Sequence, residues 1–166
     1  MQHIIFVTKQ NRKMQKEKHY INSIYYQLEL TAKYCKYLGS QLIKKINVPI
    51  TLDEVVTLDT IATNGEMSQR DLAKLILKDR SSTGRILSSL ENRGFVKRTA
   101  DTKNNRLIRK IMLTEAGKNT LSGITVELKE YLQKIPQILS EEKIDKIKKS
   151  MSEFREILKQ EVELNI

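Results

Sequence analysis

Two short helical patterns, each with a strong cap, lie in the middle of this chain and constrain its fold more than any other feature. Ser68 begins the first pattern with a hydroxyl, and Asp71 follows three residues later, which is close to a capping box. Asp79 can cap a second helix over residues 80–92, because its carboxylate can accept the first free backbone N–H groups. Gly94 can end that helix in a left-handed conformation. The spacing therefore predicts two short helices joined by a tight turn.

The second of these helices separates its side chains by chemistry. Its apolar positions recur at i, i+3, i+4 and i+7 and predict one buried face, made of Thr83, Ile86, Leu87 and Leu90. The remaining face is small, polar and basic, with no acidic residue before Glu91. It consists of Arg80, Ser81, Ser82, Gly84, Arg85, Ser88 and Ser89. A helix with this division can bury one side and present hydroxyl and guanidinium groups to a groove of DNA.

Two β-prone runs follow this helix. Residues 95–99 and 107–113 predict a hairpin, with the polar and charged residues 100–106 as its loop. Two short helices followed by a basic hairpin form a winged helix-turn-helix, a module that reads DNA. The predicted fold class is mainly α with a small β-hairpin wing, and the winged helix-turn-helix covers residues 51–113.

The distribution of charge agrees with contact to double-stranded DNA. The net charge is +10. Residues 78–110 hold ten Lys and Arg against three Asp and Glu, and residues 1–18 hold five against one. Residues 111–166 hold nine against ten. An ordinary lysine-rich surface would spread its charge evenly, whereas here the charge gathers on the second helix, the wing and the tail.

Composition excludes several other classes of protein. The single cysteine rules out a disulfide within the chain and fits a reducing cytoplasm. No apolar run reaches the roughly 18 residues of a membrane helix, and no segment resembles a signal peptide. His3, His19 and Cys35 form no chelating cluster, so we expect no metal. Without a glycine-rich phosphate loop or a nucleophile turn, the sequence predicts neither an enzyme nor a cofactor.

Long amphipathic helices are predicted on both sides of the winged region. Helical spacing holds from His19 to Ile46, through Ile21, Ile24, Tyr25, Leu28, Ala32, Cys35, Leu42 and Ile43, and Pro49 stops it. A capping box from Thr51 to Glu54 begins a further helix that runs through Ala62. After the wing, Thr114 caps a helix that Pro136 interrupts. Ser140 begins a last helix with an apolar stripe of Ile144, Ile147, Met151, Phe154, Leu158 and Val162.

Apolar stripes on terminal helices outside a compact unit suggest burial against a second copy of the chain. We therefore predict a homodimer in which residues 19–50 and 114–166 form a helical dimerisation region. Residues 1–18 form a basic N-terminal tail without periodicity. This tail is interpreted as disordered, or as extra residues upstream of a start at Met14. The alternative is an arm that touches phosphate or strengthens the dimer contact.

Over about residues 20–160, the sequence resembles the MarR (multiple-antibiotic-resistance regulator) family of bacterial transcription factors. The resemblance is most specific in SQRDLAK (68–74), DRSSTGRILSSLENRGFVKR (79–98) and LTEAG (113–117). It implies an α-helical dimer with two winged helix-turn-helix lobes. Typical members repress promoters, often their own, and release DNA when a small phenolic ligand or an oxidant arrives.

The wing departs from the family pattern at two points. The family usually has Asp-x-Arg there, whereas this chain has Asn104, Asn105 and Arg106, so the carboxylate that would orient the arginine is absent. The return strand from Arg106 to Thr114 is also one residue longer than usual, which suggests a β-bulge.

The predicted DNA contacts follow from the chemistry of the grooves. Arg85 is the candidate for a bidentate contact to guanine in the major groove, while Arg80, Ser81 and Ser82 can reach bases or phosphates. Gly84 either allows close approach or marks a position of weak readout, and Ser88 lies on the same face. On the wing, the contacts to phosphate or the minor groove are assigned to Arg98, Lys103, Asn105 and Arg106. A dimer predicts a near-palindromic site with half-site centres about 34 Å apart.

The sequence defines the site that would sense an effector or an oxidant less well than it defines the DNA contacts. The family pocket lies between the dimerisation helices and the reading lobe, where Tyr25, Tyr26 or Tyr34 could contact a small phenolic or other aromatic effector. Cys35 lies on the apolar stripe, where a cysteine is usually a small inert hydrophobe, and redox sensing through it is the alternative. A second alternative is a winged-helix module for protein interaction or dimerisation that does not bind DNA.

Overall fold

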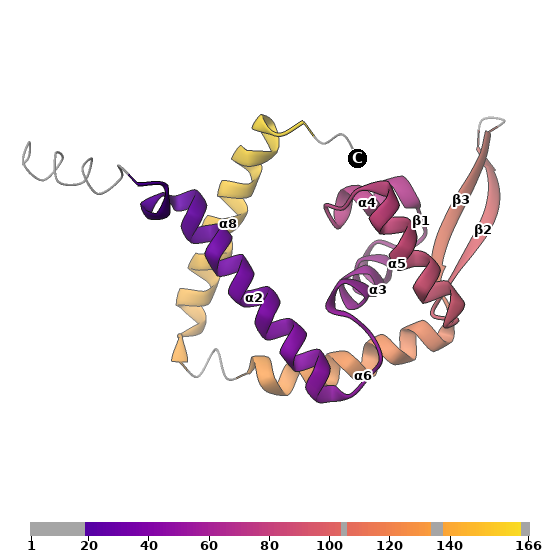
Figure 1. Ribbon diagram of the computed structural model, residues 1–166, viewed down its shortest axis with the longest axis horizontal. Helices are drawn as coiled ribbons and strands as arrows, with labels where there is room; N and C mark the ends of the chain where they lie inside the picture. Colours follow the sequence, from indigo (N-terminus) through magenta and orange to yellow (C-terminus); the bar gives the residue numbers. More distant parts are fainter. Residues whose placement is uncertain (1–18, 104–105, 134–137, 164–166) are drawn as a thin grey trace, which may run out of the picture. The chain divides into compact units, whose positions relative to one another are not determined.

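A computed structural model describes residues 19–103, 106–133 and 138–163, and at 101–103, 106–109, 131 and 132 it describes the backbone alone. The elements in order are η1 (Tyr20–Asn22), α2 (Ile24–Ile46), α3 (Leu52–Asn64), β1 (Met67–Ser68), α4 (Gln69–Leu75), α5 (Arg80–Asn92), β2 (Val96–Lys103), β3 (Arg106–Leu113), α6 (Glu115–Leu132) and α8 (Glu141–Glu161). The fold is mainly helical with a small antiparallel wing, as predicted (Figure 1). The chain divides into two compact units, one ending at Gln41 and one beginning at Leu42. The tail 1–18 and Pro136 lie outside the described residues.

The prediction of one continuous helix from His19 is wrong, because the first unit has a break at Ser23. Ser23 has an extended backbone, with φ −72° and ψ 152°, and separates the short 3-10 turn η1 from α2. Its hydroxyl oxygen accepts the Tyr26 N–H at 3.2 Å, so it closes the first turn of α2 in the way that a serine cap does. At the other end, Asn47 adopts a left-handed φ of 55° two residues before Pro49. Asparagine tolerates that conformation better than most side chains.

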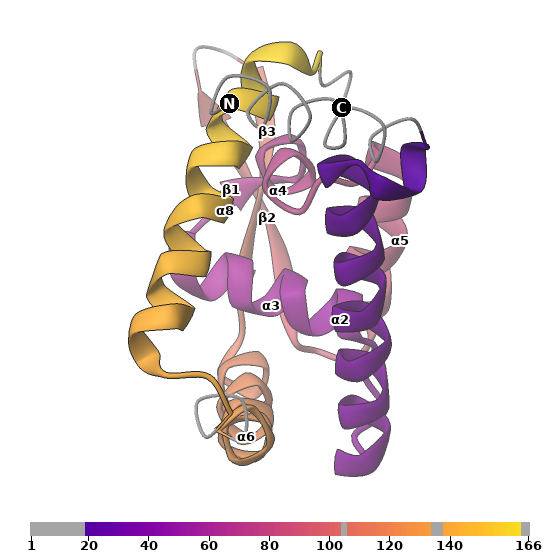
Figure 2. The ribbon, with the colours of Figure 1, turned by 90° about the vertical axis from the view of Figure 1, so that its left-hand side faces the viewer.

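The second unit has one apolar core, to which the last turn of α2 contributes Ile43. In this unit α3 lies between α4 and α6 (Figures 1 and 2). The largest of the fully buried side chains include Leu58 of α3, Leu72 of α4, Leu87 and Leu90 of α5, Ile111 of β3 and Ile124 of α6. Both helices of the helix-turn-helix thus contribute to the core shared with α3 and the sheet, and α5 does so through the predicted positions Leu87 and Leu90.

The wing is a three-stranded sheet in the order β1-β3-β2. β2 and β3 pair from Val96↔Leu113 to Lys103↔Arg106 without a break in register, so the predicted loop over 100–106 and the predicted bulge are both wrong. An antiparallel ladder satisfies backbone groups whatever the side chains are, and propensity underestimates such polar strand ends. The third strand, β1, pairs with β3 through Met67↔Ile111 and was not predicted, because two residues give no periodicity.

The start of α6 packs tightly against the start of β2. A Cβ on Gly117 would lie 2.0 Å from the Phe95 carbonyl oxygen, so this position accepts no side chain. Thr114 accepts the Gly117 N–H at 3.1 Å and donates its hydroxyl to the Gly94 carbonyl at 2.5 Å. The predicted cap at Thr114 and the left-handed Gly94, with φ 72°, are confirmed. The threonine therefore both caps α6 and anchors it to the end of the helix-turn-helix.

The last helix, α8, is capped by Ser140, whose hydroxyl accepts the Lys143 N–H at 3.4 Å. The prediction of this helix and its cap is confirmed. No residue of α8 is buried, although its apolar stripe is regular. Among the described helices, none combines the length and the apolar character needed to cross a membrane.

Candidate nucleic-acid interface

Helix α5 begins at the cap that the sequence predicted. The Asp79 carboxylate accepts the Ser82 N–H and the Ser82 hydroxyl, each at 2.7 Å. These two hydrogen bonds, the backbone one first, hold the pKa of Asp79 below its ordinary value. The group therefore stays charged at neutral pH, which suits the positive end of a helix dipole.

On the outward face of α5, the positions predicted to contact bases are not covered by other described parts of the chain. Arg80, Ser81 and Arg85 are all exposed. Arg85 donates from Nη2 to the Ser82 hydroxyl oxygen at 3.2 Å. Ser82 thus links the cap to the arginine and limits the directions in which its guanidinium can point.

Gly84 faces α4. A Cβ at this position would lie 3.2 Å from Nε2 of Gln69, and the same amide donates to the Arg80 carbonyl at 3.1 Å. The glycine therefore leaves room for the Gln69 amide between α4 and the first turn of α5.

Arg98 and Ser88 contact each other at the junction of α5 and β2. Arg98 donates from Nη2 to the Ser88 hydroxyl oxygen at 3.0 Å, and its Nε lies 3.3 Å from a carboxylate oxygen of Glu91. The Arg98 side chain is 18% exposed. Its charge is therefore already paired within the protein.

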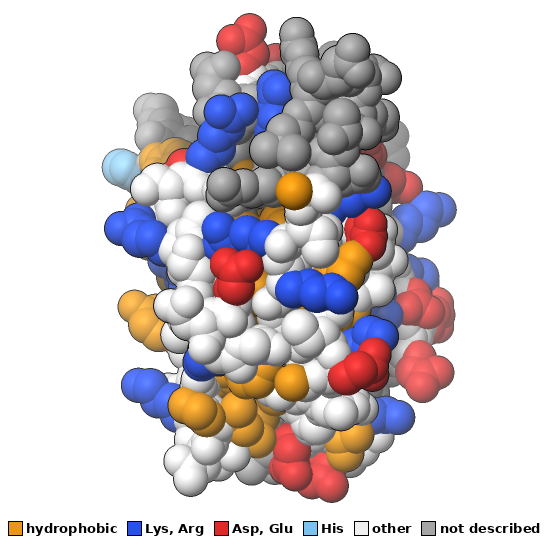
Figure 3. Space-filling model, turned by 90° about the vertical axis from the view of Figure 1, so that its right-hand side faces the viewer, with side chains coloured by type: hydrophobic (Ala, Val, Ile, Leu, Met, Phe, Trp, Pro, Cys, Tyr) orange, Lys and Arg blue, Asp and Glu red, His pale blue; other side chains and the backbone are white. Residues whose placement is uncertain are grey.

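The remaining predicted contacts lie at the wing tip. Lys103 and Arg106 close the ladder of β2 and β3, but their side chains and the whole of Asn105 lie outside the described part of the chain. Figure 3 shows the face that carries the wing, where Lys and Arg side chains are interspersed with Asp and Glu. The basic side chains on this face therefore do not form a uniform positive patch.

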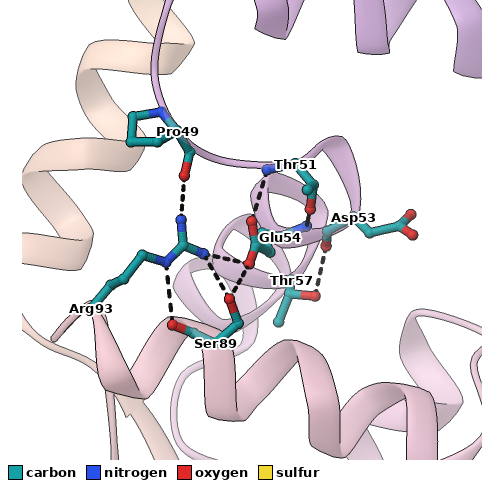
Figure 4. Close-up of polar contacts among 7 residues, drawn as sticks. All are labelled: Pro49, Thr51, Asp53, Glu54, Thr57, Ser89 and Arg93. Atoms are coloured by element: carbon teal, nitrogen blue, oxygen red, sulfur yellow. Dashed lines mark hydrogen bonds and ion pairs between the residues drawn. The ribbon is translucent and has the colours of Figure 1, made fainter.

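Sequence reasoning missed a polar cluster behind α5, which we call the Glu54 junction: Glu54, Ser89, Arg93 and the Pro49 carbonyl (Figure 4). Ser89 is exposed, as predicted, and its hydroxyl also donates to Glu54 Oε1 at 2.8 Å, a contact that was not predicted. Arg93 donates to Glu54 Oε1 and to the Pro49 carbonyl through separate nitrogens. The capping box was a visible signal for one role of Glu54, yet nothing local indicated the second role.

The electrostatics of this junction keep Glu54 ionised. Burial alone would favour the neutral acid. The hydrogen bonds from the Thr51 N–H, Ser89 and Arg93 outweigh burial and hold the pKa of Glu54 below its ordinary value. Arg93 also stacks over the Phe95 ring, 5.3 Å from its centroid. The junction is a fully partnered ionic contact between α3 and α5.

A pocket of about 560 Å³ lies between α3 and α6. Its lining is mostly apolar and comprises Leu52, Val55, Val56, Asp59, Leu121, Thr125, Leu128, Lys129 and Gln133. None of the predicted tyrosines lines it: Tyr25 and Tyr34 are exposed in the first unit, and Tyr26 is half-buried there with its ring edge-on to Tyr20.

Cys35 is exposed in this chain and does not pack as a buried hydrophobe within it. Within the described residues, no group of three or more His, Cys, Asp and Glu side chains could hold a metal ion.

A capped helix pair with an outward basic face, followed by a three-stranded wing, defines a winged helix-turn-helix protein. The model of the MarR family matches residues 50–108. The HTH-type transcriptional regulator YybA of Bacillus subtilis strain 168 is 30% identical over 101 residues, which cover 52% of this chain and 67% of that protein.

Two solved structures show the same fold. The Staphylococcus aureus MepR–DNA complex has a TM-score of 0.67 at 22% identity, with 82% of this chain and 98% of that chain covered. NadR in complex with 4-hydroxyphenylacetate has a TM-score of 0.71 at 24% identity, with 84% and 100% covered. The chain belongs to the MarR family. It is a DNA-binding helix-turn-helix transcriptional regulator, and the prediction that it is not an enzyme is confirmed by that membership.

Proposed function

We propose that this chain is a cytoplasmic, dimeric repressor that binds a near-palindromic operator and leaves it when a small aromatic effector binds. The observation that carries this proposal is the exposed start of α5. There Arg80, Ser81 and Arg85 lie clear of other described protein, and the Asp79 cap holds Ser82 against Arg85. A recognition helix needs such an N-terminal end, because that end meets the base edges in the major groove.

Each predicted contact has a distinct role in the proposal. Arg85 reads guanine, with about 1–3 kcal/mol of discrimination against other bases. Lys103 and Arg106 at the wing contact phosphate or the minor groove and add affinity without base identity. Ser88 and Arg98 already bind each other, so we assign them to the support of the α5–β2 junction.

A dimer is supported by apolar side chains that the single chain leaves exposed. Tyr20, Ile21 and Ile24 are each more than half exposed at the start of the first unit, and α8 has no buried residue. Exposed apolar stripes of this kind mark interaction surfaces. Two copies related by a two-fold axis would place two α5 helices in successive major grooves, about 34 Å apart.

The pocket between α3 and α6 is the proposed effector site. It is large enough for a small aromatic molecule, its walls are mainly apolar, and Lys129 offers a cation for a carboxylate or phenolate. NadR was solved with such a molecule, 4-hydroxyphenylacetate. Titration of the native chain with this compound, and with phenylacetate as the analogue without the hydroxyl, tests the site. Binding that Thr125→Trp does not block would place the site elsewhere.

The operator is tested by selecting bound duplexes from a random pool with the native chain. Enrichment of a near-palindrome is expected, and enrichment of nothing would refute the proposal. Salt-titrated binding then compares two variants on the selected and a scrambled duplex. Arg85→Ala should lose about ten-fold of its sequence preference, whereas Lys103→Ala should weaken both duplexes alike. Equal losses of preference in the two variants would refute the role of Arg85.

A further inference from the structure

Helix α3 has two faces with different neighbours. Leu52, Val55, Val56 and Asp59, spaced at i, i+3, i+4 and i+7, line the pocket shared with α6. Glu54, Thr57, Leu58 and Ile61 repeat the same spacing two residues later and are buried. Two residues correspond to a rotation of about 200° around a helix. The first turn of α3 therefore has the pocket on one side and the Glu54 carboxylate on the other.

Both oxygens of that carboxylate are used. Oε2 accepts the Thr51 N–H at 2.7 Å and closes the capping box of α3. Oε1 accepts the Ser89 hydroxyl at 2.8 Å and is ion-paired with Arg93 (Figure 4). Since the Glu54 side chain is only 7% exposed, water does not replace these partners easily. One buried group thus joins the beginning of α3 to the last turn of α5.

The Glu54 junction is a direct polar connection between the first turn of α3 and the end of α5. A buried carboxylate that loses a charged partner costs more free energy than a small adjustment of a neighbouring helix. At its other end, α5 is hydrogen-bonded to α4 through Gln69 and the Arg80 carbonyl, at 3.1 Å. A displacement of the first turn of α3 at the pocket would therefore change the angle of α5 about that second contact.

We propose that Glu54 is a positioning residue that sets the orientation of α5 for DNA and passes to α5 any displacement of α3 made at the pocket. This inference rests on the proposed function, because it concerns the regulation of the same DNA-reading helix. Glu54 does not line the pocket, and in this proposal it acts on α5 through Ser89 and Arg93.

The positioning role is tested with Glu54→Gln. Glutamine is accepted at this place in a capping box, but its amide cannot accept from both Thr51 and the α5 donors. Amide exchange over residues 88–92 of free protein should become about ten-fold faster, and preference for the selected operator should fall about ten-fold with scrambled DNA bound as before. Native exchange rates and native preference would overturn the proposal.

The matched control is Asp53→Asn, which removes the same charge from the neighbouring residue of the same turn. Asp53 points away from the junction, and its carboxylate pairs with Lys78 at 3.0 Å on a more exposed surface (Figure 4). Exchange in α5 and operator preference should stay within about two-fold of native, as for other exposed pairs. If Asp53→Asn matched Glu54→Gln, charge rather than the junction would be responsible. Should Glu54→Gln not fold, Ser89→Ala removes the same bond from the α5 side and leaves the capping box intact.

Transmission from the pocket is tested by filling it with a side chain. Thr125→Trp, or Val56→Phe if the first variant does not fold, should weaken operator binding about ten-fold in the native background, but less than about two-fold with Glu54→Gln also present. No loss in the native background, or equal losses in both, would overturn the inference. If the native chain selected no operator, the proposed function would fail by itself. The change in α5 exchange caused by Thr125→Trp, with and without Glu54→Gln, would still decide the inference.

Discussion

Helix α5 and the last helix, α8, both have a regular apolar stripe, but only the stripe of α5 is buried within the chain. In α5, the predicted apolar positions Leu87 and Leu90 are fully buried within the chain. In α8, no residue of a similarly regular stripe is buried: Ile147 is 47% and Met151 39% exposed, and Ile144, Phe154 and Leu158 are only partly buried. An apolar stripe indicates that a helix must be covered. The stripe alone does not indicate whether the covering surface belongs to the same chain or to another.

The largest change in stability is expected when a core side chain next to the helix-turn-helix is truncated. Leu58 of α3 is fully buried, so Leu58→Ala should lower the free energy of unfolding by about 2–5 kcal/mol through lost burial and a cavity. Denaturant titration measures this change. Val126→Ala on the exposed side of α6 is the control and should stay within about 0.5 kcal/mol. Similar losses at both positions would mean that the core does not lie where we place it.

A second substitution tests the contact between α6 and β2. Gly117→Ala should destabilise the protein by about 1–3 kcal/mol, because the new Cβ would overlap the Phe95 carbonyl. Gly123→Ala in the same helix meets nothing within 4 Å and should instead stabilise by up to about 1 kcal/mol. Thermal unfolding of the two variants should therefore shift in opposite directions. Shifts in the same direction would contradict the close approach.

The pH dependence of stability should report the Glu54 junction. The pKa of this carboxyl is lowered in the folded state, so its contribution is complete above the ordinary value of about 4.5 and is lost as pH falls through the folded pKa. Between about pH 5 and pH 3, Glu54→Gln should lose stability less steeply than the native chain, since it has no such proton to take up. Asp53→Asn should keep the native slope. An unchanged slope in Glu54→Gln would mean that the junction is not formed in solution.

The smallest change in the stability of the single chain is expected from a substitution in α8. Ile147→Asp should alter the free energy of unfolding of the single chain by no more than about 0.5 kcal/mol, because this side chain is not buried within the chain. Sedimentation velocity should nevertheless show loss of the dimer. Ser150→Asp, at an exposed polar position of the same helix, should remain dimeric. A dimer that survives Ile147→Asp would remove α8 from the proposed interface.

The local signals of the sequence were reliable because they act within one helical turn. Ser68, Asp79, Thr114 and Ser140 all cap the helices that they were predicted to cap. The short range of these signals also explains where the predictions were wrong. Ser23 interrupts the first predicted helix by capping α2, and helical spacing on both sides of it concealed the break. The strands of the wing are longer than their β-propensity predicted, because backbone pairing across the ladder includes polar residues of low propensity.

By itself, the sequence determined where most helices begin and which side of α5 is apolar, since caps and periodicity are properties of neighbouring residues. Only the tertiary structure decided that the exposed Ser89 donates its hydroxyl to Glu54, and that Arg98 contacts Ser88 and Glu91. The partners in these contacts lie up to 35 positions apart in the chain. Their meeting depends on the angle at which helices pack, and a periodic pattern does not encode that angle.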